Sequence, residues 1–219
     1  MKYSFKRFTK TMNKHLSYLP IKRLFDLFGS LLGTAILSPL LAVCTIITFC
    51  DCRGNPFFLQ KRVGQNQKIF KILKFRSMPK GTKQIPPEDM DIREQESMIT
   101  KWGGFLRKTS IDEMPQLINI FLGQMSFIGP RPSQTENVER PLIEERLSYL
   151  PTAYDVKPGL SGYAQVKMMK GHNAKEKARL DSYYVAHISF FLDAKIFLVS
   201  LVPFHLVKAE KSRKEKAES

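Results

Sequence analysis

Cysteine and histidine are scarce in this sequence, and neither falls in the spacing of a zinc site. The 3 cysteines are Cys44, Cys50 and Cys52, which cluster in and just after an apolar run. An odd, clustered set does not form a disulfide framework, so we expect a reducing compartment, the cytoplasm. Internal repeats and base-stacking RNA motifs are missing too. These absences argue against a disulfide-stabilised secreted domain, a zinc protein and a repeat protein.

Acidic residues are outnumbered by basic ones. The chain has 35 Lys and Arg against 20 Asp and Glu, a formal net charge of +15. Such an excess suits anionic lipid, nucleic acid or phosphorylated substrates. Because the positive charge gathers beside apolar segments, with no acidic residue before Asp26, we expect an anionic membrane surface as partner. The apolar segments disfavour nucleic acid, which charge alone would also suggest.

The longest apolar run covers residues 24–50, where Asp26 is the only charge. Crossing a bilayer takes about 20 apolar residues. The run is long, starts late and lacks a small-x-small cleavage pattern, so we do not expect a cleaved signal peptide. Ser38-Pro39 lies near its centre, where proline removes a helix hydrogen bond and serine can bond back to the freed backbone.

The charges that flank this run leave two topologies open. Basic residues precede it, and Arg53, Lys61 and Arg62 follow it. The positive-inside rule would place both flanks in the cytoplasm, which is impossible for a helix that spans the membrane. From the residues alone, the choice lies between a kinked spanning helix and a re-entrant hairpin that dips into one leaflet and returns.

Two further segments have a pattern typical of a membrane surface. Residues 1–20 carry apolar side chains at helical spacing among lysines, which indicates either an interfacial amphipathic helix or a disordered basic tail. Residues 188–207 are apolar but broken by Asp193, Lys195 and Pro203, as in a helix that lies on the membrane; a core helix is the alternative. We expect the charged tail from Lys208 to be disordered.

A basic β-hairpin is expected after the apolar run. Residues 57–63 and 68–76 flank the polar turn 64–67, an arrangement typical of paired strands. Its basic residues are either solvated or converge on a phosphate, and they are Lys61, Arg62, Lys68, Lys71, Lys74 and Arg76. Further along, we expect a short strand at 163–166 and a helix at 175–187.

An adjacent acidic pair, Asp112 and Glu113, lies at the expected start of a helix that ends near Gly123. Pro115 fits the first turn of that helix, where a missing N–H costs nothing. The unpaired N–H groups there keep a carboxylate ionised, so that it can act as a nucleophile or a metal ligand. Acidic residues also occur at helix starts without any function. Beyond the helix, two prolines fix Arg131 in a Gly-Pro-x-Pro loop.

Nine short motifs occur in one order over about residues 20–205, and together they resemble the bacterial sugar transferases, the monotopic phosphoglycosyl transferases. They are Lys22 to Asp26, Ser38-Pro39, Gln60 to Gly64, Lys74 to Met78, Gly103 to Arg107, Thr109 to Gln116, Gly123 to Pro132, Lys157 to Gly162, and Asp181 to Tyr184. The resemblance implies an enzyme that moves a sugar 1-phosphate from a UDP-sugar to polyprenyl phosphate. Such an enzyme acts at the cytoplasmic face of the bacterial inner membrane, in cell-surface glycoconjugate biosynthesis.

The resemblance also implies roles for single residues. Asp112 would be the nucleophile and form an acyl phosphate as UMP leaves, while Mg²⁺ would be held by Asp112 and Glu113. Arg131 would contact the nucleotide. We expect further substrate contacts from the remaining basic residues of the matching motifs, namely Lys61, Arg62, Lys74, Arg76, Arg107 and Lys157.

The match at Ser38-Pro39 favours the re-entrant topology. The expected fold is α+β, a small membrane-associated catalytic domain with an N-terminal re-entrant membrane helical hairpin, a β-hairpin and interfacial amphipathic helices. We expect a basic amphipathic segment at 1–20, the re-entrant membrane helix at 21–52, a cytoplasmic catalytic domain at 53–207 and a charged tail at 208–219. The sequence leaves the sugar and a homo-oligomeric state open. A membrane scaffold without catalysis is the alternative, which the intact acidic pair and Arg131 disfavour.

Overall fold

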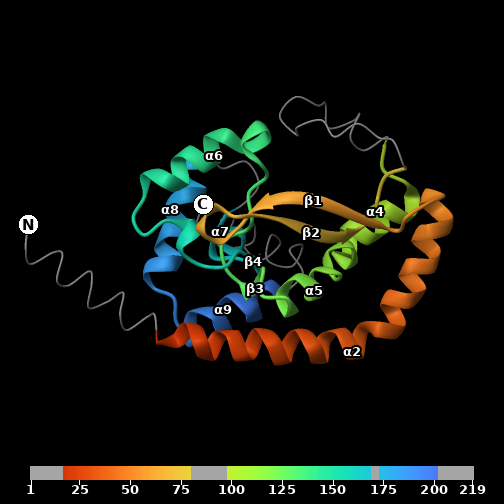
Figure 1. Cartoon of the computed structure of the whole chain (residues 1–219), viewed down its shortest axis with the longest axis horizontal. Coiled ribbons are helices and arrows are strands. Elements are labelled where there is room, and N and C mark those ends of the chain that lie inside the picture. The colour runs from red at the N-terminus through yellow and green to blue at the C-terminus, as the bar shows by residue number, and fades with distance from the viewer. Residues whose placement is uncertain (1–16, 80–97, 169–172, 202–219) are drawn as a thin grey trace, which may run out of the picture. The chain divides into compact units, whose positions relative to one another are not determined.

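The computed structural model describes residues 17–79, 98–168 and 173–201, and these combine helices with two small sheets (Figure 1). They divide into two compact units. Unit 1 comprises the described parts of residues 1–22, 126–131 and 141–219, and unit 2 those of residues 23–125 and 132–140. The predicted amphipathic segment 1–20 lies mostly outside the described residues, and the tail 208–219 lies wholly outside them. Both segments and the predicted domain boundaries stay predictions.

Helix α2 (Tyr18–Cys52) is 35 residues long and includes the whole apolar run. Among the described residues it is the one helix long and apolar enough to cross a membrane, and 11% of its most apolar stretch is buried. Pro39 has no N–H to offer the carbonyl of Ala35. Ser38 Oγ donates to that carbonyl at 2.8 Å instead, which confirms the predicted compensation. The helix continues through Pro39 and bends in its second half (Figure 1).

The structure thus holds one bent helix where a helical hairpin was predicted. A reversal at Ser38-Pro39 would leave several backbone groups without partners, whereas a bend loses one hydrogen bond, and Ser38 replaces it. A bent helix can still enter and leave one leaflet, so the re-entrant topology stays a prediction.

Strands β1 (Phe57–Val63) and β2 (Ile69–Phe75) form the predicted antiparallel hairpin. The short 3₁₀ helix η1 (Gln65–Gln67) joins them, with Asn66 at φ 53°, a conformation that asparagine tolerates. The rings of Phe57 and Phe75 stack with centroids 5.5 Å apart. Phe75 is buried with Cys44 and Leu106 in one apolar cluster of unit 2.

Helix α4 (Lys101–Thr109) packs closely against the end of the hairpin. Thr100 Oγ1 caps the helix by accepting from the N–H of Gly103 at 2.9 Å. A Cβ at Gly103 would lie 2.2 Å from the carbonyl oxygen of Ser77, so only glycine permits this approach. The helix is also tied to α2, because Trp102 Nε1 donates to Thr48 Oγ1 at 2.9 Å.

Helix α5 (Gln116–Phe121) is fixed to β2 by the buried side chain of Asn119. Its Oδ1 accepts from the N–H of Leu73 at 2.9 Å, and its Nδ2 donates to the carbonyl of Lys71 at 2.8 Å. Asn119 therefore bonds the edge of β2 much as another strand would. The last carbonyls of α5 accept from Arg23, whose guanidinium lies 2.7 Å from both Ile120 O and Phe121 O.

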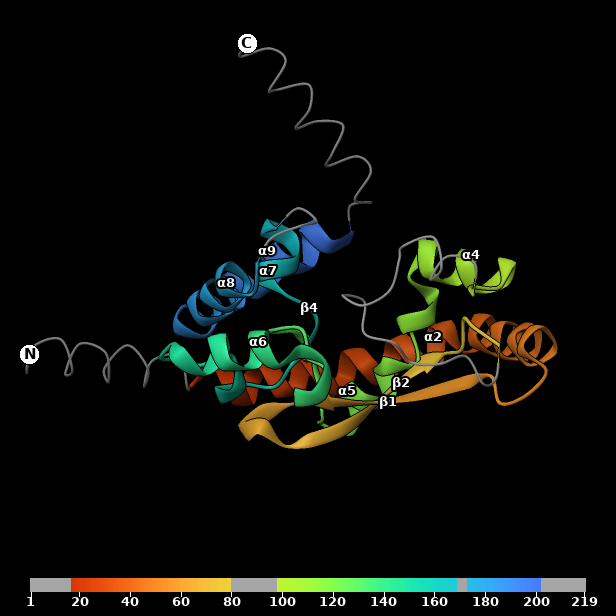
Figure 2. The same cartoon turned by 90° about the horizontal axis from the view of Figure 1, so that it is seen from above.

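Unit 1 contains the second sheet, in which β3 (Ser126–Ile128) pairs in parallel with β4 (Gly159–Ser161). Its other elements are η3 (Ala153–Asp155), α7 (Tyr163–Lys167), α8 (Ala174–Ala186), α9 (Phe190–Leu201) and most of α6 (Glu136–Ser148). Figure 2 shows α7, α8 and α9 side by side. They enclose a buried apolar core of Ile128, Val156, Tyr184, Val185, Ile188 and Ile196.

Two predictions about unit 1 have opposite outcomes. The helix predicted at 175–187 is confirmed as α8. The strand predicted at 163–166 is wrong, because those residues form α7 and the strand β4 precedes them. So short an apolar run cannot distinguish the periodicity of a helix from that of a strand.

Candidate active site

The acidic pair Asp112 and Glu113 lies in unit 2 on the 3₁₀ helix η2 (Ile111–Glu113). Ser110 ends α4 with φ 58°, in the left-handed region, and this turns the chain sharply into η2. The predicted helix start at the pair is confirmed in part: the pair lies in the first turn of the 3₁₀ helix η2, and the α-helix α5 begins only after Pro115.

Glu113 is bonded to a cation on the neighbouring strand. Lys74 Nζ lies 2.7 Å from Glu113 Oε1, and the two side chains are 14% and 19% exposed. Such partial burial shields the pair from solvent screening better than a surface ion pair. The hairpin thus supplies a positive charge directly beside the acidic pair, and Asp112 is half-buried next to it.

Two arginines flank Ser77, the residue that α4 approaches. Arg107 Nε donates to the buried Ser77 Oγ at 2.8 Å. Arg76 donates through one terminal nitrogen to the carbonyl of Phe57 at 3.4 Å, and its buried Nε has no acceptor among the described residues. A buried donor without an acceptor is costly. A phosphate oxygen would satisfy it.

Gln116, which follows the acidic pair closely, also has a buried donor that finds no acceptor among the described residues. Its side chain is 2% exposed, and within the described chain its Nε2 finds no acceptor. Two buried donors without acceptors, Arg76 Nε and Gln116 Nε2, therefore occur in the unit that carries the acidic pair. A buried donor of this kind is a candidate contact for an anion.

The other basic residues of the hairpin do not all gather with Lys74. Side chains alternate between the faces of a strand, and the register places Arg62 and Lys74 on one face and Lys61, opposite Lys71, on the other. Lys61 is exposed. Arg62 donates to Gln60 Oε1 at 2.7 Å and to the carbonyl of Pro132 at 3.3 Å. The hydrogen bond from Arg62 to the carbonyl of Pro132 thus holds the loop at Pro132 beside β1.

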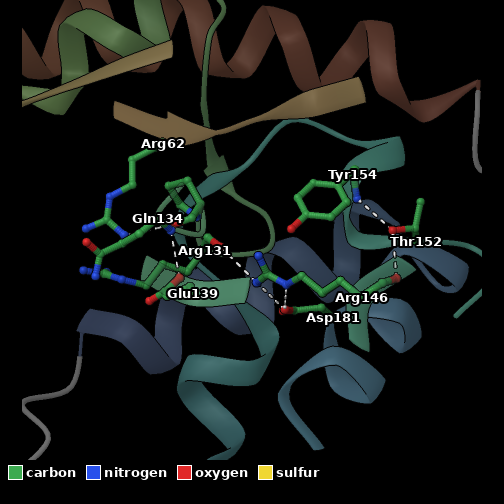
Figure 3. Close-up of polar contacts among 9 residues, drawn as sticks. Arg62, Arg131, Gln134, Glu139, Arg146, Thr152, Tyr154 and Asp181 are labelled. Carbon is green, nitrogen blue, oxygen red and sulfur yellow. Dashed lines mark hydrogen bonds and ion pairs between the residues drawn. The ribbon is translucent and has the colours of Figure 1, made fainter. Parts of the chain in front are cut away.

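Arg131 and Lys157 belong to two loops of unit 1 that run side by side. A Cβ at Gly159 would lie 2.1 Å from Gly129 N, and one at Gly129 would lie 2.5 Å from the carbonyl oxygen of Lys157. Both basic side chains are half-buried. The carbonyl of Arg131 accepts from Arg146 at 3.0 Å (Figure 3).

Sequence reasoning missed Arg146, which forms a fully buried ion pair with Asp181. Burial raises the pKa of the Asp181 carboxyl, and the Arg146 guanidinium opposes that rise. For Arg146, burial acts to lower the pKa, but the charge and hydrogen-bond interactions with Asp181 and Tyr154 together outweigh it and the pKa is raised. The guanidinium therefore keeps its charge. Asp181 lies within a matching motif, but no pattern in the sequence singles out Arg146.

The residues that could hold a metal ion are Asp112 and Glu113. In residues 17–79, 98–168 and 173–201, no group of three or more His, Cys, Asp and Glu side chains gathers as metal ligands. Mg²⁺ commonly takes one or two carboxylates and completes its shell with water and substrate phosphate oxygens. The acidic pair fits that ion only together with a phosphorylated substrate.

Comparisons with known proteins identify a family. The family model described as bacterial sugar transferase matches residues 17–205. The exopolysaccharide production protein PSS of Rhizobium leguminosarum bv. phaseoli is 34% identical over 190 residues, which cover 84% of this chain and 94% of that protein. The undecaprenyl-phosphate glucose phosphotransferase of Komagataeibacter xylinus is 34% identical over 190 residues, 82% of this chain but 35% of that protein.

A further relative is the UDP-glucose:undecaprenyl-phosphate glucose-1-phosphate transferase of Klebsiella pneumoniae. It is 36% identical over 190 residues, 82% of this chain and 39% of that protein. The chain thus spans less than half the length of these two named transferases, and nearly all of the Rhizobium protein. The resemblance seen in the motifs is confirmed, and the chain belongs to the bacterial sugar transferase family.

Proposed function

We propose that this chain transfers a sugar 1-phosphate from a UDP-sugar to polyprenyl phosphate at the cytoplasmic face of the bacterial inner membrane. Family membership and the activities named for two relatives support the reaction class. The observation that carries the proposal is the half-buried acidic pair on η2, with Lys74 Nζ 2.7 Å from Glu113 and buried donors of Arg76 and Gln116 that lack acceptors among the described residues.

The first step joins the sugar phosphate to the enzyme. A carboxylate oxygen of Asp112 attacks the phosphorus that carries the sugar, and the bond from that phosphorus to the oxygen bridging the two phosphates breaks. UMP leaves with the bonding electron pair, and an aspartyl phosphosugar remains. Negative charge accumulates on the phosphate oxygens, so fixed cations such as Arg76 and Arg107 would stabilise the transition state.

The second step transfers the group to the lipid. A phosphate oxygen of polyprenyl phosphate attacks the same phosphorus, the acyl–phosphate bond breaks, and Asp112 is released as a carboxylate. The product is a polyprenyl diphosphate sugar. Two successive substitutions at one nucleophile explain how a soluble and a lipid substrate can use one site in turn.

Mg²⁺ is the expected cofactor, with Asp112 and Glu113 as its protein ligands. When bound, it would neutralise charge on the diphosphate. The protein groups around it have separate tasks. Lys74 balances the charge of Glu113 and fixes its carboxylate. The resemblance to the family assigns the nucleophilic attack to the neighbouring carboxylate of Asp112.

The test is a transfer assay with purified chain, a panel of UDP-sugars and undecaprenyl phosphate in detergent micelles or lipid nanodiscs. We expect UMP release with at least one UDP-sugar, in step with formation of a polyprenyl diphosphate sugar. Omission of the lipid should limit UMP to about one equivalent of enzyme, because the covalent intermediate then accumulates. Absence of UMP with every UDP-sugar would favour a membrane scaffold without catalysis.

A further inference from the structure

The buried ion pair of Arg146 and Asp181 is connected to the backbone of a proposed substrate-binding loop. Each side chain is 1% exposed. Arg146 Nε and one terminal nitrogen donate to Asp181 Oδ2 at 2.9 and 2.5 Å. The same terminal nitrogen donates to the carbonyl of Arg131 at 3.0 Å (Figure 3). One guanidinium therefore joins α6, α8 and the loop.

Contacts around Arg146 hold it in place. Its own carbonyl accepts from Thr152 Oγ1 at 3.0 Å, and its guanidinium carbon lies 5.8 Å from the centre of the Tyr154 ring. Both residues belong to the chain around η3, in the same unit. The guanidinium thus has little freedom to turn away from the loop.

Stability alone does not explain a charged pair at this position. Hydrophobic residues of similar volume often serve a protein's stability equally well or better, because burying two charges is costly. The pair does supply a rigid fork of N–H donors. A guanidinium can bond a carboxylate and still direct an N–H at a carbonyl, as Arg146 does with Arg131.

We propose that Arg146 and Asp181 are positioning residues for Arg131. Pro130 and Pro132 restrict the backbone on either side, and the bond from Arg146 fixes the peptide plane that follows Arg131. With that plane fixed, the side chain of Arg131 leaves the loop in one direction, as binding to the diphosphate of a nucleotide requires. This inference rests on the proposed function and on the nucleotide contact that the family resemblance implies for Arg131.

The experiment compares two ways of disturbing the pair. Arg146→Met combined with Asp181→Leu removes both charges without leaving one buried alone, and Arg146→Lys keeps an ion pair but loses the fork. Arg179→Lys is the matched control, because that arginine lies in the same unit and is 66% exposed. Thermal unfolding, kcat and KM for the UDP-sugar are measured for each variant.

We expect both disturbed variants to unfold within a few degrees of wild type and to raise KM for the UDP-sugar about tenfold, with a smaller change in kcat. Arg131→Ala should raise KM for the UDP-sugar much less in the Arg146→Lys background than in wild type, because the side chain of Arg131 is then already misplaced. Arg179→Lys should match wild type in every measurement.

Two results would overturn the positioning role. The first is a folded variant of the pair with the KM of wild type. The second is an Arg131→Ala penalty that is equal in both backgrounds, which would mean that the residues act independently. If the double variant fails to fold, Arg146→Lys decides alone. If the wild-type chain releases no UMP, the proposed function is rejected together with the positioning role. If the wild-type chain releases UMP and the variants keep its KM for the UDP-sugar, only the positioning role is rejected.

Discussion

Asp112 and Glu113 are neighbours in the sequence, yet the structure gives them different surroundings. Glu113 is bonded to Lys74 at 2.7 Å, whereas Asp112 occupies the middle of the three residues of η2. A carboxylate held by a lysine has a fixed orientation. This contact supports an orienting role for Glu113, while the resemblance to the family assigns the reacting carboxylate to Asp112.

Replacing Asp112 with asparagine tests the nucleophile. We expect Asp112→Asn to abolish transfer, by roughly 10³-fold or more, because an amide cannot form the acyl phosphate. The measurement is UMP release in the absence and presence of polyprenyl phosphate. Glu144→Gln, an exposed acidic position on α6, is the control and should behave as wild type. Substantial turnover in Asp112→Asn would exclude this residue as the nucleophile.

Glu113 and the metal are tested together. Glu113→Gln should lower kcat by roughly 10²-fold or more, because the amide binds Mg²⁺ weakly and no longer pairs with Lys74. EDTA should abolish the activity of the wild-type enzyme, and added Mg²⁺ should restore that activity. In Glu113→Gln, the Mg²⁺ concentration for half-maximal activity should rise. Full activity in the presence of EDTA would contradict a metal at this site.

At the scale of elements, α4 and the end of β2 meet at a contact that only glycine permits. A Cβ at Gly103 would lie 2.2 Å from the carbonyl oxygen of Ser77, whereas one at Gly104 would meet nothing closer than a side-chain carbon of Ile99 at 3.9 Å. Arg107 is fixed by Ser77. The spacing of helix and strand therefore also determines the place of a candidate substrate-binding arginine.

This contact provides a matched pair of variants. Gly103→Ala should destabilise the protein by about 1–3 kcal/mol, because the new methyl group forces α4 away from the strand end. Gly104→Ala should be neutral or slightly stabilising, because alanine favours a helix more than glycine does. Chemical denaturation measures both, and UMP release should fall in Gly103→Ala alone. Equal stability of the two variants would show that α4 can shift without cost.

The sequence predicted those elements whose signals are local. Apolar and polar alternation around residues 64–67 indicated the hairpin, and the run 24–50 indicated the long helix α2. At the acidic pair the sequence indicated a helix start but not its type, since the pair lies on a 3₁₀ turn and the α-helix begins only after Pro115. Pro39 was expected to reverse the chain, but one hydroxyl group suffices to keep the helix intact.

The missed features depend on contacts between distant residues. Arg146 and Asp181 are 35 positions apart, and an arginine in a polar helix gives no sign that it will be buried. The bonds of Asn119 to β2 span more than 40 positions and likewise leave no periodic pattern. For the candidate site, the motifs indicated the residues, whereas the contact of Glu113 with Lys74 came only from the fold.

At the scale of the whole molecule, the exposed side chains of two helices bear on membrane association. Along α2, large apolar residues such as Phe25, Phe28 and Ile36 are more than half exposed. On α9, Phe191 is 84% exposed while Asp193 is buried, bonded to Lys22 and Tyr184. The acidic residue that interrupts the apolar pattern is thus satisfied inside the protein, which leaves an apolar exterior suited to lipid.

The last prediction concerns how α2 meets the bilayer. We predict that residues 24–50 enter and leave the same leaflet, because basic residues flank both ends and cytoplasmic flanks prefer positive charge. The proposed function likewise requires a soluble UDP-sugar to reach the acidic pair from the cytoplasm. The Ser38 hydroxyl keeps the helix continuous around Pro39, and the bend in the second half of α2 (Figure 1) is the feature that a continuous helix needs in order to return.

Single cysteines at positions 10 and 212, in a chain whose native cysteines are replaced by serine, measure this topology in intact cells with an impermeant maleimide. Both positions should be protected, since both ends of the chain are then cytoplasmic. Ser38→Ala combined with Pro39→Ala should straighten the helix and let it span, so that position 10 becomes labelled while position 212 stays protected. Labelling at position 10 with Ser38 and Pro39 intact would show that α2 spans the membrane, and the bend would then serve packing within the bilayer rather than return to the surface.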